Sequence, residues 1–207
     1  AFHVFLQGVM ANRTSYQIGI PAVPLSELYP SELDNRLGKN VRFHLRSSIK
    51  YIDPDEHGAD YYISAVPFEH INQLIPDLKL PLERFEHSPI TGIHLWFDRE
   101  ITALPHAVLL NRTIQWMFRK STNYFQCVVS ASRSLLSLSR EEIIETAHRE
   151  LGEFFPATHD ARLIKAHVVK EIRATYSSTP GLETYRPLTM TKYSNLFLAG
   201  DWTQTGW

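Results

Sequence analysis

Cysteine is nearly absent from this chain, and a one-sided charge and long apolar runs are absent altogether. Cys127 is the single cysteine of 207 residues, which excludes an internal disulfide and a cysteine-rich metal site. Lysine and arginine number 21 against 22 for aspartate and glutamate, so no net field attracts nucleic acid. No apolar run approaches the roughly 20 residues that cross a bilayer. With no secretory signal in the first ten residues, the sequence favours a globular, cytoplasmic protein.

Several motifs that define common active sites are also missing. The nine glycines never fall two residues apart, so the chain contains no Gly-x-Gly-x-x-Gly turn for a pyrophosphate. The ten histidines include no pair at i, i+4 spacing, and no metal site is expected. No Gly-x-Ser-x-Gly elbow is present to suggest a hydrolase. Asn-Arg-Thr triplets begin at Asn12 and Asn111, but without a secretory signal they indicate polar turns.

Two periodicities dominate what the chain does contain. Runs rich in β-branched and aromatic residues predict strands at residues 41–53, 59–67, 90–98, 106–110, 113–120, 124–132 and 166–176. Short connections from residue 90 onward favour an antiparallel meander. Ser139 and Glu142 form a capping box, and the helix that follows has an apolar stripe of Ile143, Ile144, Ala147, Leu151 and Phe154.

The final stretch, NLFLAGDWTQTGW at residues 195–207, combines an apolar run with one carboxylate. Its first six residues lack alternation, which is typical of a strand buried on both faces of an α/β sheet. Ligands of such sheets bind beyond the carboxyl ends of the strands, where Asp201 lies. Gly200 allows close approach to the backbone, and the Asp201 carboxylate can accept hydrogen bonds from sugar or ribityl hydroxyls. The spacing fits equally well an Asp201 that caps a following turn or helix.

These thirteen residues resemble the carboxyl-terminal flavin motif of the FAD-dependent desaturase and amine oxidase superfamily. The resemblance is to its squalene-associated branch, the hydroxysqualene dehydroxylases. Residues 89–118 are similar to the central segment of that branch, and VPLSELYP with VRFHLRSSI is similar to its earlier region. The resemblance therefore extends over most of the chain.

The resemblance implies an α/β (α+β) architecture in which part of a Rossmann-like FAD-binding domain accompanies a substrate domain. The substrate domain is expected to have a mixed, largely antiparallel sheet and flanking helices. Residues 1–40 would be a connector with helices, 41–67 FAD-domain strands, 68–176 the substrate-binding domain and 177–207 an incomplete FAD-binding segment. In the family a glycine fingerprint precedes the first of these segments and a helix follows the last, so the chain is expected to be a fragment.

The resemblance also implies positions for the cofactor. Gly200 and Asp201 would face the ribityl and pyrophosphate part of FAD, while Gly206 and Trp207 would approach the flavin ring. The adenine side would be contacted by three further residues, Ile49, Val66 and Pro67.

The activity implied by the resemblance is reduction of hydroxysqualene, an apolar isoprenoid, to squalene. A phytoene or carotenoid desaturase, an amine oxidase-like flavoenzyme and a non-catalytic lipid-binding module without its cofactor are the alternatives. Peripheral membrane contact is expected because the substrate dissolves in lipid, and the oligomeric state is left open.

Aromatic residues that could line an isoprenoid cavity are Trp96, Trp116 and Phe118, although core packing explains each of them as well. Alternation places His94, Trp96 and Asp98 on one face of their strand. His94 and Asp98 are therefore weak candidates for the acid that protonates a leaving hydroxyl. A solvent-facing or hydrogen-bonded position on the strand is the simpler explanation of both.

Overall fold

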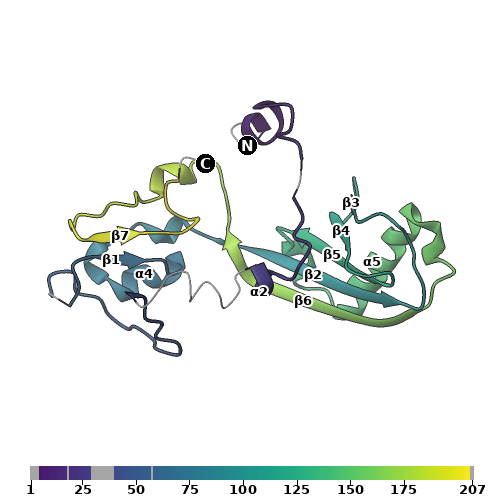
Figure 1. Ribbon diagram of the computed structural model, residues 1–207, viewed down its shortest axis with the longest axis horizontal. Coiled ribbons are helices and arrows are strands. Elements are labelled where there is room, and N and C mark those ends of the chain that lie inside the picture. The colour runs from purple at the N-terminus through teal and green to yellow at the C-terminus, as the bar shows by residue number, and fades with distance from the viewer. Residues whose placement is uncertain (1–4, 18, 29–39, 57, 206–207) are drawn as a thin grey trace. The chain divides into compact units, whose positions relative to one another are not determined.

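The computed structural model describes residues 5–17, 19–28, 40–56 and 58–205. They form two compact units, here called the split unit (Ala1–Leu80 with Arg186–Trp207) and the sheet unit (Pro81–Tyr185). The helical turns η1 (Leu6–Met10) and α2 (Leu25–Leu28) belong to the split unit. Figure 1 labels the α-helices and the strands. Within the described residues, no helix is long and apolar enough to span a membrane.

The split unit contains a parallel pair of short strands, β1 (Tyr62–Ser64) and β7 (Leu196–Leu198). Leu196 and Leu198 are buried and Phe197 is half-buried, as expected for a continuous apolar run. The strand predicted within residues 195–200 is therefore confirmed. Because parallel strands end at the same edge, the segments that follow β1 and β7 emerge side by side.

Helix α4 (Phe68–Leu74) follows β1 and was not predicted from the sequence. Its buried residues Phe68, Ile71 and Leu74 are spaced three apart, which is the signal that was overlooked. The Ile52 N–H donates to the Leu74 carbonyl oxygen at 2.9 Å, so the preceding segment lies against the end of this helix. The strand predicted at residues 41–53 is wrong, because this segment turns at positive-φ Arg46 and forms no ladder with the described strands.

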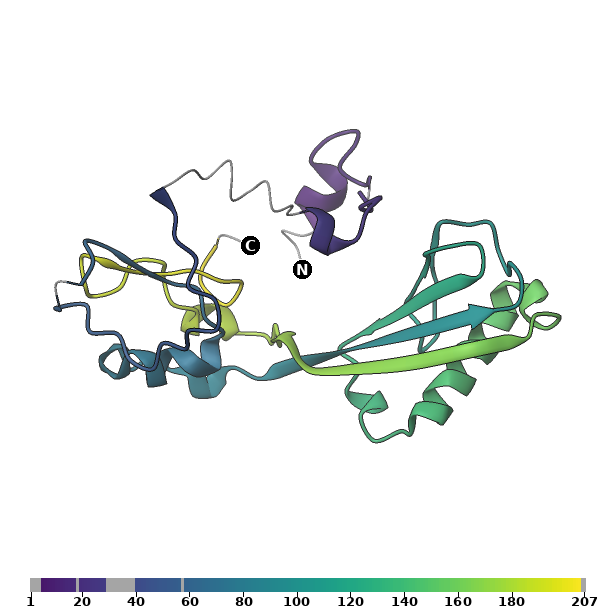
Figure 2. The same ribbon diagram turned by 60° about the horizontal axis from the view of Figure 1, so that its bottom comes forward.

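The sheet unit is built on five antiparallel strands in the order β3-β4-β5-β2-β6. Their bounds are β2 (His87–Phe97), β3 (His106–Val108), β4 (Trp116–Arg119), β5 (Tyr124–Ser130) and β6 (Leu163–Tyr176). The predicted antiparallel pairing is confirmed, but only β3, β4 and β5 follow one another as a meander, because β2 pairs with β5 and β6 and not with β3. The long strands β2 and β6 pair along most of their length. Figure 2 shows α5 (Arg140–Phe154) along one face of this sheet.

The core of the sheet unit lies between that face and α5. Ser139 Oγ accepts the Glu142 N–H at 3.1 Å and the Ser139 N–H donates to Glu142 Oε2 at 2.7 Å, which confirms the capping box. The apolar stripe is right except at its end, where Phe154 is 43% exposed and the next residue, Phe155, packs against the core. Phe154 is the last residue of the helix, and its ring lies beneath the Arg112 guanidinium, whose Cζ is 5.6 Å from the ring centroid. Core side chains from both layers include Ile93, Leu95, Phe97, Phe125, Cys127, Ile143, Ala147, Leu151 and Val168.

The two units divide the chain at different residues from the domains expected above. Residues 68–80 were expected in the substrate domain, but α4 packs within the split unit. Residues 177–185 were expected with the carboxyl-terminal segment, yet the Ser177 N–H donates to the Glu86 carbonyl oxygen at 2.7 Å. That bond continues the β2–β6 pairing and keeps the segment in the sheet unit.

Candidate functional site

The turn that follows β7 is locked against the segment that follows β1. Gly200 has a φ of 145°, and a Cβ added there would lie 2.7 Å from Nε1 of Trp202. The buried Trp202 indole donates from Nε1 to the Val66 carbonyl oxygen at 3.1 Å. Glycine is therefore needed at position 200 both for its backbone angle and for the space that Trp202 occupies.

A buried arginine, Arg186, also holds this turn in place. Its guanidinium donates to the carbonyl oxygens of Asp201, at 2.9 Å, and of Thr203. The Asp201 side chain is exposed, so the turn presents a carboxylate at the surface next to the carboxyl edge of the β1–β7 pair. Sequence reasoning missed Arg186 because a single arginine in a loop gives no local signal of its partners.

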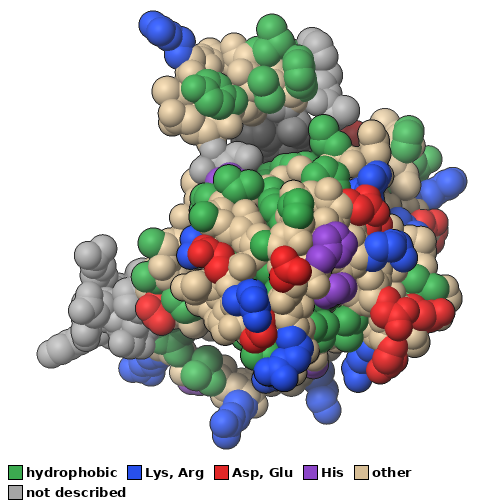
Figure 3. Space-filling model, turned by 90° about the vertical axis from the view of Figure 1, so that its right-hand side faces the viewer, with side chains coloured by type: hydrophobic (Ala, Val, Ile, Leu, Met, Phe, Trp, Pro, Cys, Tyr) green, Lys and Arg blue, Asp and Glu red, His purple; other side chains and the backbone are tan. Residues whose placement is uncertain are grey.

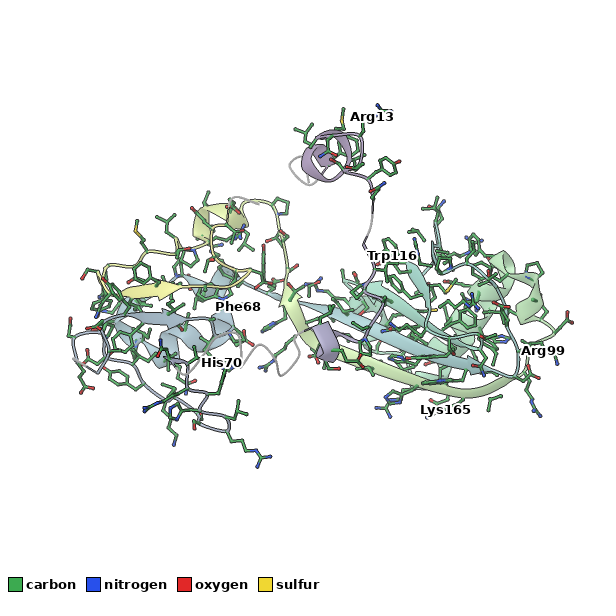
Figure 4. All side chains as sticks on the ribbon, in the orientation of Figure 1. Arg13, Phe68, His70, Arg99, Trp116 and Lys165 are labelled. Carbon is green, nitrogen blue, oxygen red and sulfur yellow. The ribbon has the colours of Figure 1, made fainter. Side chains whose placement is uncertain are left out.

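A cavity of about 780 Å³ lies beside this edge in the split unit. All three residues expected on the adenine side line it: Ile49, Val66 and Pro67. Its other lining residues are Ser47, Ser48, Lys50, His70, Gln73 and Leu74. Figure 4 marks His70 on α4. An apolar wall with polar side chains around it fits the adenosine part of FAD, which needs both stacking surface and hydrogen-bond donors.

The structure thus gathers five of the seven expected cofactor residues in one region. Ile49, Val66 and Pro67 line the cavity, and the Trp202–Val66 hydrogen bond ties the Gly200–Asp201 turn to it. Gly206 and Trp207, the other two, lie outside the described residues.

The second candidate region is the face of the five-stranded sheet opposite to α5, called the outer face. Trp96, Trp116 and Phe118 all lie on it, half-buried, as do His94 and Tyr124. The alternation predicted for β2 is confirmed, because the residues that alternate with His94 and Trp96 face the core. They are Ile93, Leu95 and Phe97. Figure 4 marks Trp116 on β4 and Lys165 on β6. The three side chains proposed to line an isoprenoid cavity therefore share one surface.

Aromatic rings on the outer face stack on one another. The Trp96 and Tyr124 rings are parallel with centroids 4.5 Å apart, and those of Trp116 and Phe118 are 5.6 Å apart. Lys165 Nζ lies 4.8 Å from the Trp96 ring centroid, in cation–π range. The contacts of Tyr124 and Lys165 with Trp96 were not predicted, because they depend on strand register.

His94 and Tyr124 form the polar centre of this face. His94 Nδ1 lies 2.7 Å from the Tyr124 hydroxyl oxygen, within hydrogen-bond distance. Burial lowers the pKa of His94, and His167 and Lys120 lower it further, so the imidazole is mainly neutral at pH 7. Burial raises the pKa of Tyr124, which keeps the phenol protonated. The pair is an uncharged hydrogen-bonding group beside the aromatic rings of the outer face.

Asp98, the other weak catalytic candidate, lies one residue beyond β2. Its carboxylate accepts hydrogen bonds from the Arg99 side chain at 3.2 Å and the Arg162 N–H at 2.9 Å. These bonds, that from Arg99 first, lower the pKa of Asp98, so it remains ionised and is poorly suited to donate a proton. Its role in the structure is to join the ends of β2 and β6.

Charge elsewhere is mixed, and the single thiol is inert. Figure 3 shows acidic and basic side chains interspersed over the face that it draws. Across the described ranges, histidine, cysteine, aspartate and glutamate form no group of three or more that could hold a metal ion. Cys127 is a buried core residue, and burial, with Glu150 adding to it, raises the pKa of its thiol to about 12. It therefore stays protonated in the folded protein.

Comparison with known proteins gives a family match over most of the chain. The sequence profile of a family described as flavin containing amine oxidoreductase matches residues 35–207. The 15-cis-phytoene desaturase of Synechococcus elongatus is 30% identical over 70% of this chain and 35% of its own length. The hydroxysqualene dehydroxylase of Sinorhizobium fredii is 33% identical over 71% of this chain and 34% of its own length.

A solved structure supports the fold. A protein of Exiguobacterium sp. 255-15 whose description names protoporphyrinogen oxidase matches with a TM-score of 0.50 at 18% identity. The match covers 70% of this chain and 37% of that one. The expected α/β class is confirmed, and the chain spans about a third of the length of these relatives.

Proposed function

This chain belongs to the flavin-containing amine oxidoreductase family, and we propose that its enzyme reductively removes the hydroxyl group of hydroxysqualene to give squalene. Members of the family are flavin oxidoreductases, and FAD is the cofactor that the family implies. The match to a family of flavin enzymes also argues against the alternative of a lipid-binding module without a cofactor. The substrate and the direction of the reaction are the proposed part.

The split unit would hold the cofactor. Gly200 and Asp201 would meet its ribityl and pyrophosphate part, while the cavity lined by Ile49, Val66 and Pro67 would receive its adenosine part. Bound FAD, once reduced by a two-electron donor, would supply the hydride that replaces the hydroxyl group, and the hydroxyl would leave as water with one proton. The Arg186 and Trp202 contacts keep the turn in place, so the backbone is preorganised before the cofactor binds.

The observation that carries the substrate proposal is the outer face of the sheet unit. Trp96, Trp116 and Phe118 give this face aromatic ring surface, in two stacked pairs, that is suited to a polyisoprenoid chain, and the His94–Tyr124 pair adds a hydrogen-bonding group. Hydroxysqualene combines these two properties, a long hydrocarbon with one hydroxyl. Similarity of residues 89–118 to the hydroxysqualene branch supports the same substrate, as does the 33% identity to a member of that branch.

Desaturation of a phytoene-like hydrocarbon is the second candidate. The observation in its favour is the 30% identity to a phytoene desaturase. An amine substrate is less well supported, because Lys165 and Lys120 lie near the aromatic rings and would repel a cation. For either isoprenoid we expect a cytoplasmic enzyme that contacts the membrane peripherally, since the substrate partitions into lipid.

The proposal is tested with the full-length protein loaded with FAD. Under anaerobic conditions with dithionite, hydroxysqualene should be converted to squalene, as measured by gas chromatography and mass spectrometry. Phytoene with oxidised FAD and a quinone acceptor is the parallel assay for desaturation. Unchanged hydroxysqualene with a protein that retains bound flavin would refute the proposal, and desaturated phytoene would replace it with the second candidate.

A further inference from the structure

Polarity on the outer face changes from one cross-strand row to the next. Antiparallel register places one residue of each strand in line across the sheet. The valine row consists of Val108, Trp116, Val128, Gly92 and Val169. The imidazole row next to it consists of His106, Phe118, Gln126, His94 and His167. The tyrosine row beyond contains Tyr124, Trp96 and Lys165. The surface therefore runs from apolar to polar over three rows.

The His94–Tyr124 contact joins the imidazole and tyrosine rows, and neither side chain makes a further hydrogen bond to the residues that the structure describes. If the Tyr124 hydroxyl donates to His94 Nδ1, then Nε2–H is a donor and the phenol oxygen an acceptor. If Nδ1–H donates instead, Nε2 is an acceptor and the phenol a donor. Either tautomer thus offers one donor and one acceptor, which is the pattern that an alcohol hydroxyl complements.

Gly92 leaves room beside this pair. It precedes His94 on the same face of β2, and a Cβ added to it would lie 3.7 Å from His94 Nε2. A glycine inside a strand often marks close approach of another group. A ligand that follows the valine row over Gly92 would therefore reach Nε2 without crossing a side chain on β2.

We propose that the His94–Tyr124 pair binds the hydroxyl group of an isoprenoid alcohol whose hydrocarbon chain lies along the valine row. The pair makes the protein prefer the alcohol to the hydrocarbon of the same skeleton. A hydrocarbon would remove water from the pair without replacing its hydrogen bonds, whereas the alcohol replaces them. The identity of the alcohol, hydroxysqualene, rests on the function proposed above.

The test compares binding of hydroxysqualene and squalene to the full-length protein in detergent micelles, followed by tryptophan fluorescence. Tyr124→Phe keeps the ring that stacks on Trp96 and removes only the hydroxyl. It should lower the preference for hydroxysqualene over squalene by about ten-fold, the effect of one lost neutral hydrogen bond. Trp116→Phe is the control, because it trims the valine row and should weaken both ligands alike.

Gly92→Ala is the second variant, since it leaves both polar side chains in place and puts a methyl group beside His94 Nε2. It should also reduce the preference. The inference is overturned if the unmodified protein binds both ligands equally, or if Tyr124→Phe and Gly92→Ala both retain its preference. Conversion of hydroxysqualene is measured separately. If the enzyme is active but the two variants still prefer hydroxysqualene to squalene, only this inference is contradicted. An inactive enzyme whose preference depends on Tyr124 contradicts only the proposed reaction.

Discussion

Replacing Gly200 with alanine should destabilise the split unit by about 2–4 kcal/mol and weaken FAD binding. The φ of 145° costs a residue with a side chain about 1–3 kcal/mol. The added Cβ would also lie 2.7 Å from Trp202 Nε1 and 2.9 Å from Trp202 Cδ1, so the indole must move. Its movement breaks the hydrogen bond to Val66, which contributes about 1 kcal/mol. Because Val66 lines the cavity, we expect FAD affinity to fall about ten-fold or more.

Gly181→Ala is the matched control. Gly181 also has a positive φ, 84°, but no atom lies within 4 Å of the Cβ position. It should therefore show backbone strain alone and leave FAD affinity unchanged. Thermal unfolding of the full-length protein, with and without FAD, and quenching of flavin fluorescence measure the two effects. Equal losses in the two variants, or unchanged FAD affinity in Gly200→Ala, would refute the role assigned to the Trp202 contact.

Three further predictions concern buried groups of the sheet unit. Burial raises the pKa of the Cys127 thiol from 9.0 to about 12, so at pH 8 the folded protein should react with a thiol reagent about a thousand-fold more slowly than the unfolded protein. Rapid labelling of the folded protein would contradict the burial of Cys127. Glu150 accepts hydrogen bonds from two backbone N–H groups at 3.1 and 2.8 Å, so Glu150→Gln should lower the free energy of unfolding in urea by about 1–3 kcal/mol. Glu153→Gln, which changes an exposed ion pair, should lower it by about 0.5 kcal/mol or less. Burial lowers the pKa of His94 below 6.5, so the unfolded chain binds more protons and stability should fall as the pH drops below 6.5. His94→Gln should flatten that slope in a pH series of melting temperatures, and an unchanged slope would assign it to other groups.

Local signals in the sequence predicted the elements that depend on local chemistry. The Ser139 capping box specifies the start of α5 through contacts three residues apart, and alternation specifies which residues of β2 face the core. The same reasoning failed at residues 41–53, where β-branched and aromatic residues predict a strand. A strand forms only where a neighbouring strand completes its hydrogen bonds, and those partners are distant in the sequence.

The candidate site was predictable only in part, for the same reason. Gly200 and Asp201 follow from a motif in consecutive residues, and Val66 with Pro67 from the family resemblance alone. The contact of Tyr124 with His94 depends on the register of β2 and β5, which alternation alone does not determine. Arg186 stabilises the Asp201 turn from a loop fifteen residues earlier, and no pattern around it indicates that partner.

The parallel pairing of β1 with β7 makes the order of synthesis matter for folding. All of the sheet unit lies between these two strands in the chain, so it leaves the ribosome complete before β7 exists. The sheet unit can therefore fold while the split unit still lacks Trp202, the residue that holds Val66 beside the cavity. Cofactor capture would accordingly follow the folding of the sheet unit, because residues made after that unit complete a site that β1 began.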